Sequence, residues 1–263
     1  MVDSNTKDFS QSIMELRYSW DKPDGTKETW EEICKRVGKH VLGVIDIPEG
    51  KKQEIIQAMI ERKFIPGGRF LAQSGREVHQ TQNCFLMRAT DTREGWGELC
   101  DKATVALMSG GGIGVDYSDL RPKGSKLKRS GGVSSGCIPL IKVINEVGRG
   151  VMAGGNRRAA IYASLDWNHG DIFDFIHIKD WSEELRKIKE KDFDFPAPCD
   201  MTNISVNLDK SFFEAFENED NPMHEHAQKV YWKVIHQMMK KAEPGFSINY
   251  KNKKESLRNA PVS

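Results

Sequence analysis

The stretch that decides the fold begins with Gln-Asn-Cys-Phe-Leu-Met (82–87) and Asp-Thr-Arg-Glu-Gly-Trp (91–96). It continues with Ser-Gly-Gly-Gly-Ile-Gly-Val-Asp-Tyr-Ser-Asp-Leu-Arg-Pro-Lys-Gly (109–124) and ends in a basic loop at Arg129. Short apolar runs predict strands over 83–88 and 112–117, and the segment between them, about 94–108, has the length of a helix. This order is typical of a parallel sheet with helices packed against it.

The same alternation continues toward the C-terminus. Three more strands are predicted over 159–165, 202–208 and 246–250, and helices are predicted over 137–151, 171–176, 210–216 and 226–241. Five strands alternating with helices predict an α/β fold, either an open parallel sheet or half of a barrel. Polar loops are expected at 124–135 and 153–158, and a charge-dense surface region at 179–198.

The N-terminal part of the chain has a different pattern. Segments 28–37 and 51–62 carry apolar residues at helical spacing, among them Trp30, Ile33 and Val37. We therefore expect a helical region over 1–66 that serves as scaffold, followed by the α/β domain over 67–263. The segment 65–75, which is rich in glycine and begins at Ile65-Pro66, is expected to be a loop.

Composition narrows the classes of function. The chain has 263 residues, 38% of them hydrophobic and 29% charged, and a net charge of +1. This balance gives no reason to expect a nucleic-acid polymer or a membrane as partner. No run approaches the roughly 18 apolar residues of a membrane span. The segment Met1–Lys7 lacks the apolar core of a signal peptide, so we expect a cytoplasmic protein.

Cys84, on the first strand, is the first candidate for chemistry. A cysteine on a strand is most often a small buried hydrophobe, and a redox role would need a second thiol close in space. Its neighbour Asn83 offers a polar group to a ligand. The five cysteines are widely spaced and contain no Cys-x-x-Cys, so we expect neither a zinc site nor a disulfide framework.

Two kinds of loop offer sites for a phosphorylated ligand. The glycines at 110–114 either let a ligand approach the backbone or form a tight helix-to-strand turn. They match neither a Walker loop nor a dinucleotide fingerprint. The basic loops suit phosphate or base recognition, although each taken alone is typical of a solvated loop; they carry Arg121, Lys123, Lys126, Lys128, Arg129, Arg157 and Arg158.

Two further polar groups have competing interpretations. Asp91 either accepts a hydrogen bond from a ribose or, with Thr92, caps the helix that follows. His224 and His226 lie two residues apart near a helix start, where their side chains point in different directions. A shared metal is therefore not expected.

Taken together, these segments resemble the catalytic chain of ribonucleotide reductase, and their motifs are most similar to those of the adenosylcobalamin-dependent branch. The matching motifs occur in the family's order over roughly 65–250. They are Pro-Gly-Gly-Arg-Phe-Leu (66–71), Asn-Cys-Phe (83–85), Gly-Gly-Gly-Ile-Gly-Val-Asp-Tyr-Ser-Asp-Leu-Arg-Pro-Lys-Gly (110–124), Ser-Gly-Gly-Val-Ser-Ser-Gly (130–136), Gly-Gly-Asn-Arg-Arg-Ala-Ala (154–160), Asp-Trp-Asn-His-Gly-Asp-Ile-Phe-Asp-Phe-Ile (166–176) and Asn-Ile-Ser-Val (203–206).

The resemblance implies a fold and a set of site residues. The family fold is a ten-stranded α/β barrel, of which the five predicted strands match the first half, after a small helical region. Cys84 would be one of two cysteines that reduce the substrate ribose. The residues bordering the substrate would be Asn83, Cys84, Gly111, Gly112, Arg157 and Arg158, the two arginines lying in the loop that reports effector identity. The effector nucleotide would be bound by Asp91, Thr92, Arg93, Arg121 and Lys128, beside an effector loop at 124–135.

The sequence also departs from the family pattern. The Asn-x-Cys-x-Glu motif that carries the radical cysteine is absent, as is the second redox cysteine. We therefore expect the N-terminal piece of a split reductase that is inactive without a separate C-terminal reductase polypeptide; a truncated chain is the other possibility. The resemblance implies a ribonucleotide substrate, adenosylcobalamin as cofactor, and ATP or a deoxynucleoside triphosphate as effector. It also implies a thioredoxin-like reductant and a dimer formed through the effector helices. The alternative is a nucleotide-binding regulatory fragment without catalysis.

Overall fold

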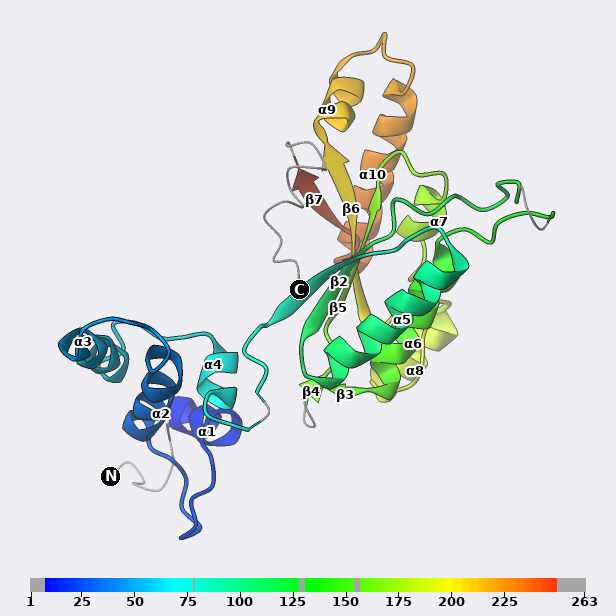
Figure 1. Ribbon diagram of the computed structural model, residues 1–263. Coiled ribbons are helices and arrows are strands. Elements are labelled where there is room, and N and C mark those ends of the chain that lie inside the picture. The colour runs from blue at the N-terminus through cyan, green and yellow to red at the C-terminus, as the bar shows by residue number, and fades with distance from the viewer. Residues whose placement is uncertain (1–7, 78, 128–130, 154–156, 250–263) are drawn as a thin grey trace, which may run out of the picture. The chain divides into compact units, whose positions relative to one another are not determined.

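The computed structural model describes residues 8–77, 79–127, 131–153 and 157–249 (Figure 1). The chain divides into two compact units, Met1–Asn83 and Cys84–Ser263. The boundary expected between 66 and 67 falls within the first unit.

The first unit is helical, as predicted. It contains α1 (Phe9–Arg17), α2 (Trp30–Leu42), α3 (Glu49–Ile60) and α4 (Gly68–Gln73). A capping box starts α2: the Thr29 hydroxyl accepts the N–H of Glu32 at 3.3 Å, and the Glu32 carboxylate accepts the N–H of Thr29 at 2.7 Å. The apolar faces of these helices share one small core, formed by Ile33, Cys34, Val37, Met59 and Leu71.

The prediction of a loop over 65–75 was wrong, because this segment contains α4. The helix has only six residues and starts with glycine, so it shows no helical period. A residue far away in sequence stabilises its end. The guanidinium of Arg36 donates to the carbonyl groups of Leu71 at 3.0 Å and Ser74 at 2.8 Å. These carbonyls lie at the helix C-terminus, where no partner exists within the helix itself.

The second unit is built on the five-stranded parallel sheet that the sequence predicts. Its strands lie in the order β1 (Cys84–Arg88), β2 (Gly112–Asp116), β5 (Ile161–Asp166), β6 (Thr202–Asp209) and β7 (Gly245–Asn249). All neighbouring pairs are parallel, and Cys84 is in register with Gly112. The order in space equals the order in sequence, so every crossover proceeds in the same direction along the sheet.

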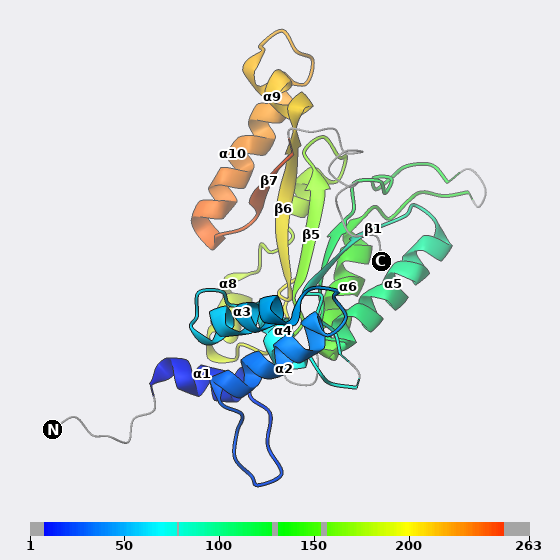
Figure 2. The same cartoon turned by 60° about the vertical axis from the view of Figure 1, so that its left-hand side comes forward.

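Right-handed crossovers in one direction place the connecting helices on the same face of a sheet. The helices are α5 (Arg93–Met108), α6 (Ile138–Gly150), α7 (Ile172–Ile176), α8 (Glu183–Lys191), α9 (Lys210–Glu217) and α10 (His224–Lys241). Apolar residues of the sheet and of these helices, except α8, form one continuous core. Figures 1 and 2 show α5 and α6 packed side by side along this face.

The two faces of the sheet differ in burial. Ile113, Val115 and Ala163 point to the helices and are buried. The opposite face carries Cys84 and Leu86, which are both exposed. Parallel sheets are normally covered on both faces. The second face of this sheet is therefore suited to pack against further protein.

Two segments contain structure that the sequence analysis did not predict. The expected loop at 153–158 includes the paired short strands β3 (Met152–Ala153) and β4 (Arg157–Arg158), which are antiparallel. The charge-dense region 179–198 includes α8, which Ser182 caps and which buries none of its residues. Most of this region is surface, as expected, although Ala197 is buried and the helix was missed.

Candidate functional site

A groove of about 1270 Å³ lies between the start of α5 and the loop that follows β2. Half of its lining residues come from 91–96 and Arg121, and the other half from the loop at 125–135. They are Asp91, Thr92, Arg93, Glu94, Trp96, Arg121, Ser125, Lys126, Leu127, Val133, Ser134 and Ser135. The structure therefore brings four of the five predicted effector residues together. The fifth, Lys128, lies outside the described residues.

The start of α5 separates the roles of Asp91 and Thr92. The Thr92 hydroxyl caps the helix by accepting the N–H of Gly95 at 2.9 Å. Asp91 is not the capping residue. Its Oδ2 accepts a hydrogen bond from Nε of Arg121 at 2.6 Å. Both side chains of this ion pair are about one third exposed, at 32% and 38%. The pair is accessible to a ligand in the groove, and an incoming anion can compete for Arg121.

The loop wall of the groove is more ordered than a polar loop would suggest. The N–H of Gly124 donates to Ser134 O at 2.9 Å, and the N–H of Ser134 donates to Ser125 O at 2.8 Å. Lys126 and Val133 form an antiparallel bridge further along. The described part of the loop is therefore a hairpin-like ladder that presents hydroxyl and ammonium groups toward the groove.

The charges of the groove favour an anionic ligand. The first turn of α5 contributes the positive end of the helix dipole and N–H groups that lack partners inside the helix. Arg93, Arg121 and Lys126 add cations, and Asp91 and Glu94 add acceptors suited to hydroxyl or amino groups. Cations with nearby acceptors are the groups that a nucleotide requires, the former for its phosphates and the latter for its sugar or base.

Cys84 occupies a different position from the one expected for a strand cysteine. It is exposed, on the open face of the sheet at the start of β1. Cys34, Cys137 and Cys199 are buried, and Cys100 is half-buried. Burial raises the pKa of Cys34 to about 11 and that of Cys199 to about 11. Cys84 is therefore the one exposed thiol among the five cysteines, all of which are described.

The two predicted substrate glycines have different neighbours. Gly112 lies beside Cys84 on the adjacent strand, and Gly111 lies against the ring of Phe85. A Cβ on Gly112 would lie 3.5 Å from the Sγ of Cys84. A Cβ on Gly111 would lie 2.4 Å from the Phe85 ring, so this position has no room for a side chain. The N–H groups of Gly110 and Gly111 donate to carbonyls at the end of α5, at 2.9 and 3.0 Å. These contacts account for a tight helix-to-strand turn.

The other predicted substrate residues lie at the boundary between the two units or on β4. Asn83 is exposed and ends the first unit. Arg157 lies on β4, where its backbone pairs with Ala153. Arg158 forms an ion pair with Asp194, and its guanidinium lies 4.2 Å from the centre of the Phe193 ring. In this structure Arg158 therefore contacts a segment that the sequence analysis treated only as surface.

The two histidines at the start of α10 contact the backbone of neighbouring elements. His224 Nδ1 lies 3.0 Å from Ala215 O, and His226 Nε2 lies 3.1 Å from Trp167 O. These contacts attach α10 to α9 and to the end of β5. They give both imidazoles a structural role.

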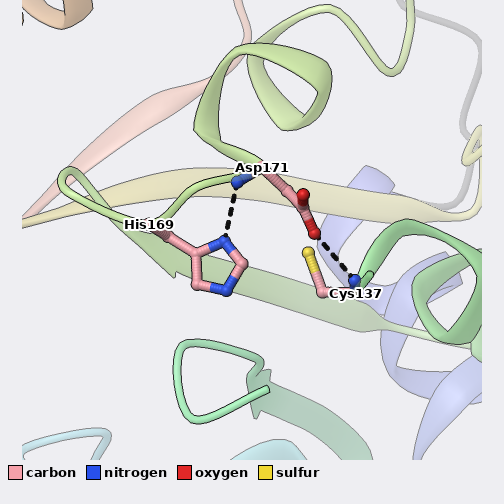
Figure 3. Close-up of side chains that lie close together, drawn as sticks. All are labelled: Cys137, His169 and Asp171. Atoms are coloured by element: carbon pink, nitrogen blue, oxygen red, sulfur yellow. Dashed lines mark hydrogen bonds between the residues drawn. The ribbon is translucent and has the colours of Figure 1, made fainter. Parts of the chain in front are cut away.

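Sequence analysis missed a cluster of three potential metal ligands, Cys137, His169 and Asp171 (Figure 3). All three are buried. The Nδ1 atom of His169 accepts the N–H of Asp171 at 3.0 Å, so Nε2 carries the ring proton and donates to Leu120 O at 2.7 Å. Burial raises the pKa of the Cys137 thiol, and the neighbouring Asp171 carboxylate raises it further.

Both ring nitrogens of His169 have backbone partners in this structure, and Asp171 accepts the N–H of Cys137 at 3.0 Å. The cluster is therefore a hydrogen-bonded unit. The one available signal was the spacing His169-x-Asp171 directly before α7, and such a signal becomes specific only when the backbone contacts are known.

These observations define a parallel α/β protein with a groove lined by cations and acceptors and one exposed thiol on an open sheet face. Comparison with known proteins gives the family. The family description "Ribonucleotide reductase, barrel domain" matches residues 82–260, and "Ribonucleotide reductase, all-alpha domain" matches residues 4–79. The chain belongs to the ribonucleotide reductase family, as the ordered motifs predicted.

Individual relatives agree with this assignment. The vitamin B12-dependent ribonucleoside-diphosphate reductase of Thermoplasma acidophilum is 29% identical over 211 residues, which cover 74% of this chain and 26% of that protein. The ribonucleoside-diphosphate reductase large subunit of Plasmodium falciparum is 33% identical over 141 residues, covering 52% and 17%. The chain thus spans about a quarter or less of these curated relatives.

A solved structure shows the same fold. The class Id ribonucleotide reductase alpha subunit of Actinobacillus ureae superposes with a TM-score of 0.71, at 17% identity, over 95% of this chain and 41% of that one. The helical region followed by a half-barrel is therefore confirmed. Among the described residues, no helix is both long enough and apolar enough to cross a membrane.

Proposed function

We propose that this chain is the N-terminal piece of a ribonucleotide reductase, which forms 2′-deoxyribonucleotides from ribonucleotides. The observation that carries the proposal is the position of Cys84, an exposed thiol on the uncovered face of a half-barrel sheet. The names of the curated relatives support a ribonucleoside diphosphate as substrate.

Cys84 supplies one of the two reducing thiols. The two thiols lose two electrons and two protons and join in a disulfide, while the ribose C2′–OH bond is replaced by C2′–H and the oxygen leaves as water. A thioredoxin-like dithiol then reduces the disulfide. A C-terminal reductase polypeptide contributes the second thiol and the radical cysteine, and packs on the open face of the sheet. Gly112 leaves space beside the Cys84 sulfur on the neighbouring strand.

The groove at 91–96 and 121–135 is the effector site in this proposal. Its cations and the start of α5 bind the phosphates of a nucleoside triphosphate, and Asp91 accepts from its sugar or base. Arg157 and Arg158 belong to the neighbouring connection between α6 and β5, which relays the identity of the effector to the substrate base.

Adenosylcobalamin is the proposed source of the radical, on the basis of the B12-dependent relatives. When bound, it supplies the radical that the complete enzyme needs. The groove carries cations and hydroxyl groups, which suit phosphates better than a largely apolar macrocycle. No cobalamin contact is therefore assigned to the residues of this chain.

Reconstitution tests the proposal. The chain is mixed with a polypeptide that carries the remaining barrel strands and Asn-x-Cys-x-Glu, together with adenosylcobalamin, a dithiol and a ribonucleoside diphosphate. Formation of deoxynucleotide by the mixture, and its loss with Cys84→Ser but not with Cys100→Ser, is the expected result. Nucleotide binding with no deoxynucleotide formed would favour the alternative, a regulatory fragment without catalysis.

A further inference from the structure

The loop that walls the groove is held at both of its ends by a single carboxylate. Asp171 Oδ1 accepts the N–H of Lys123 at 2.9 Å, at the point where the loop begins. Its Oδ2 accepts the N–H of Cys137 at 3.0 Å, where the loop ends and α6 starts. Lys123 and Cys137 are 14 positions apart in sequence, and the six loop residues that line the groove all lie between them.

The carboxylate cannot easily move from this position. Asp171 is 5% exposed, so water does not readily replace its protein partners. A Cβ on Gly136 would lie 2.3 Å from Asp171 Oδ2 and 2.9 Å from the N atom of Lys123. Gly136 also has a φ of +79°, a conformation that favours glycine. The backbone at the base of the loop is therefore shaped around the carboxylate.

A second contact fixes the backbone from which Asp171 extends. His169 accepts the N–H of Asp171 through Nδ1 (Figure 3). Its Nε2 donates to Leu120 O, three residues before Lys123. The segment between β5 and α7 thus holds the loop base through the side chains of both His169 and Asp171. Asp171 lines no part of the groove itself.

We infer that Asp171 is a positioning residue for the nucleotide groove: its carboxylate clamps the two ends of the 124–136 loop and so sets the geometry in which the loop meets a nucleoside triphosphate. The nucleotide part of this inference rests on the proposed function. Hydrogen bonds to a buried carboxylate are among the stronger ones, so the loss of one corresponds to about a ten- to hundredfold change in an equilibrium constant.

The test uses the full chain and the variant Asp171→Asn, which keeps the shape of the side chain but removes the charge and one acceptor. Asp174→Asn is the matched control, since it removes the same charge from an exposed position on α7. Amide hydrogen exchange is measured without nucleotide, and the dissociation constant of dTTP is measured separately. We expect Asp171→Asn to exchange at least about tenfold faster over 124–135, with α10 unchanged, and to bind dTTP about tenfold more weakly. The control should change neither quantity.

Hydrogen exchange and dTTP binding test the clamp and the effector proposal separately. If exchange over 124–135 is the same in Asp171→Asn as in the wild type, the clamp is refuted. If the wild-type chain binds no deoxynucleoside triphosphate, the effector proposal fails, while the exchange data still decide the clamp. If α10 also exchanges faster, the variant is globally destabilised. Lys123→Pro then decides by the same criterion, because proline lacks the N–H that donates to Oδ1; Lys123→Ala, which keeps this N–H, controls for the lost side chain.

Discussion

At the scale of single residues, accessibility separates Cys84 from the other cysteines. Cys137 and Cys199 are enclosed by the main core, and Cys34 by the core of the helical unit. A thiol reacts as the thiolate, so a buried thiol with a raised pKa reacts slowly even with a small reagent. The sequence predicted Cys84 as a strand residue but not its exposure, because exposure depends on which face of the sheet the strand presents to the helices.

Cys84 should therefore be modified first. With iodoacetamide at pH 8, we expect one fast-reacting thiol per native chain, and we expect Cys84→Ser to lose this fast phase. Mass spectrometry of the labelled peptides identifies the site. A fast phase that persists in Cys84→Ser and disappears in Cys100→Ser would assign the accessible thiol to α5 instead.

At the scale of secondary-structure elements, one buried carboxylate joins α6 and α8 to the start of β6. Asp200 has a side chain that is 3% exposed, and it pairs with Arg149 of α6 and with Lys189 of α8, whose Nζ lies 2.8 Å from Oδ2. Burial works to raise the pKa of Asp200, but the hydrogen bonds from Arg149 and Lys189 outweigh it and lower the pKa from 3.8 to about 2. The folded state thus favours the ionised carboxylate.

This depressed pKa predicts a pH-dependent stability. A shift from 3.8 to about 2 corresponds to roughly 2 kcal/mol, which is present above pH 4 and lost as the pH falls toward 2. We expect Asp200→Asn to lower the free energy of unfolding by roughly 2 kcal/mol at pH 7, and the difference from the wild type to shrink between pH 4 and pH 2. Urea denaturation at several pH values measures this.

Asp220→Asn is the control for that series, because Asp220 is an exposed carboxylate in the turn before α10. It should leave the unfolding free energy nearly unchanged at every pH. A difference between Asp200→Asn and the wild type that stays constant down to pH 2 would show that the effect of the substitution does not come from the ionised pair.

Some secondary-structure elements could be predicted from the sequence, and others could not. Long periodic segments such as α5, α6 and α10 follow from their own residues, and so do the five strands. The short helix α4 does not, because Arg36 of α2 stabilises its C-terminus. The Asp171 clamp was missed for the same reason: the two backbone N–H groups that donate to its carboxylate are 34 and 48 positions away in sequence.

At the scale of the whole molecule, the helices beside the groove expose an apolar surface. Val105 and Met108 of α5 are 63% and 62% exposed, and Val143 of the adjacent α6 is 47% exposed. Apolar side chains exposed on neighbouring helices are found at protein interfaces. They support the proposed dimer through the effector helices, in which two copies of the chain bury the same surface.

The proposed dimer predicts that one charge placed on this apolar surface weakens self-association. Val105→Asp should weaken self-association by at least about tenfold, because it places a carboxylate within the apolar contact. Met239→Asp, at an exposed position on α10, should not. Sedimentation velocity over a range of concentrations gives the dissociation constants. A wild-type chain that is monomeric at every concentration, with its nucleotide bound, would contradict the proposed dimer.

The groove is the proposed effector site, and equilibrium dialysis with deoxynucleoside triphosphates tests this proposal most directly. We predict one nucleotide bound per chain and an affinity that falls by about tenfold or more in Arg121→Ala, because a charge-assisted contact to phosphate is lost. Arg88→Ala, which breaks an exposed ion pair with Asp119 outside the groove lining, should bind as the wild type does. No saturable binding, or equal binding by Arg121→Ala and the wild type, would contradict the account.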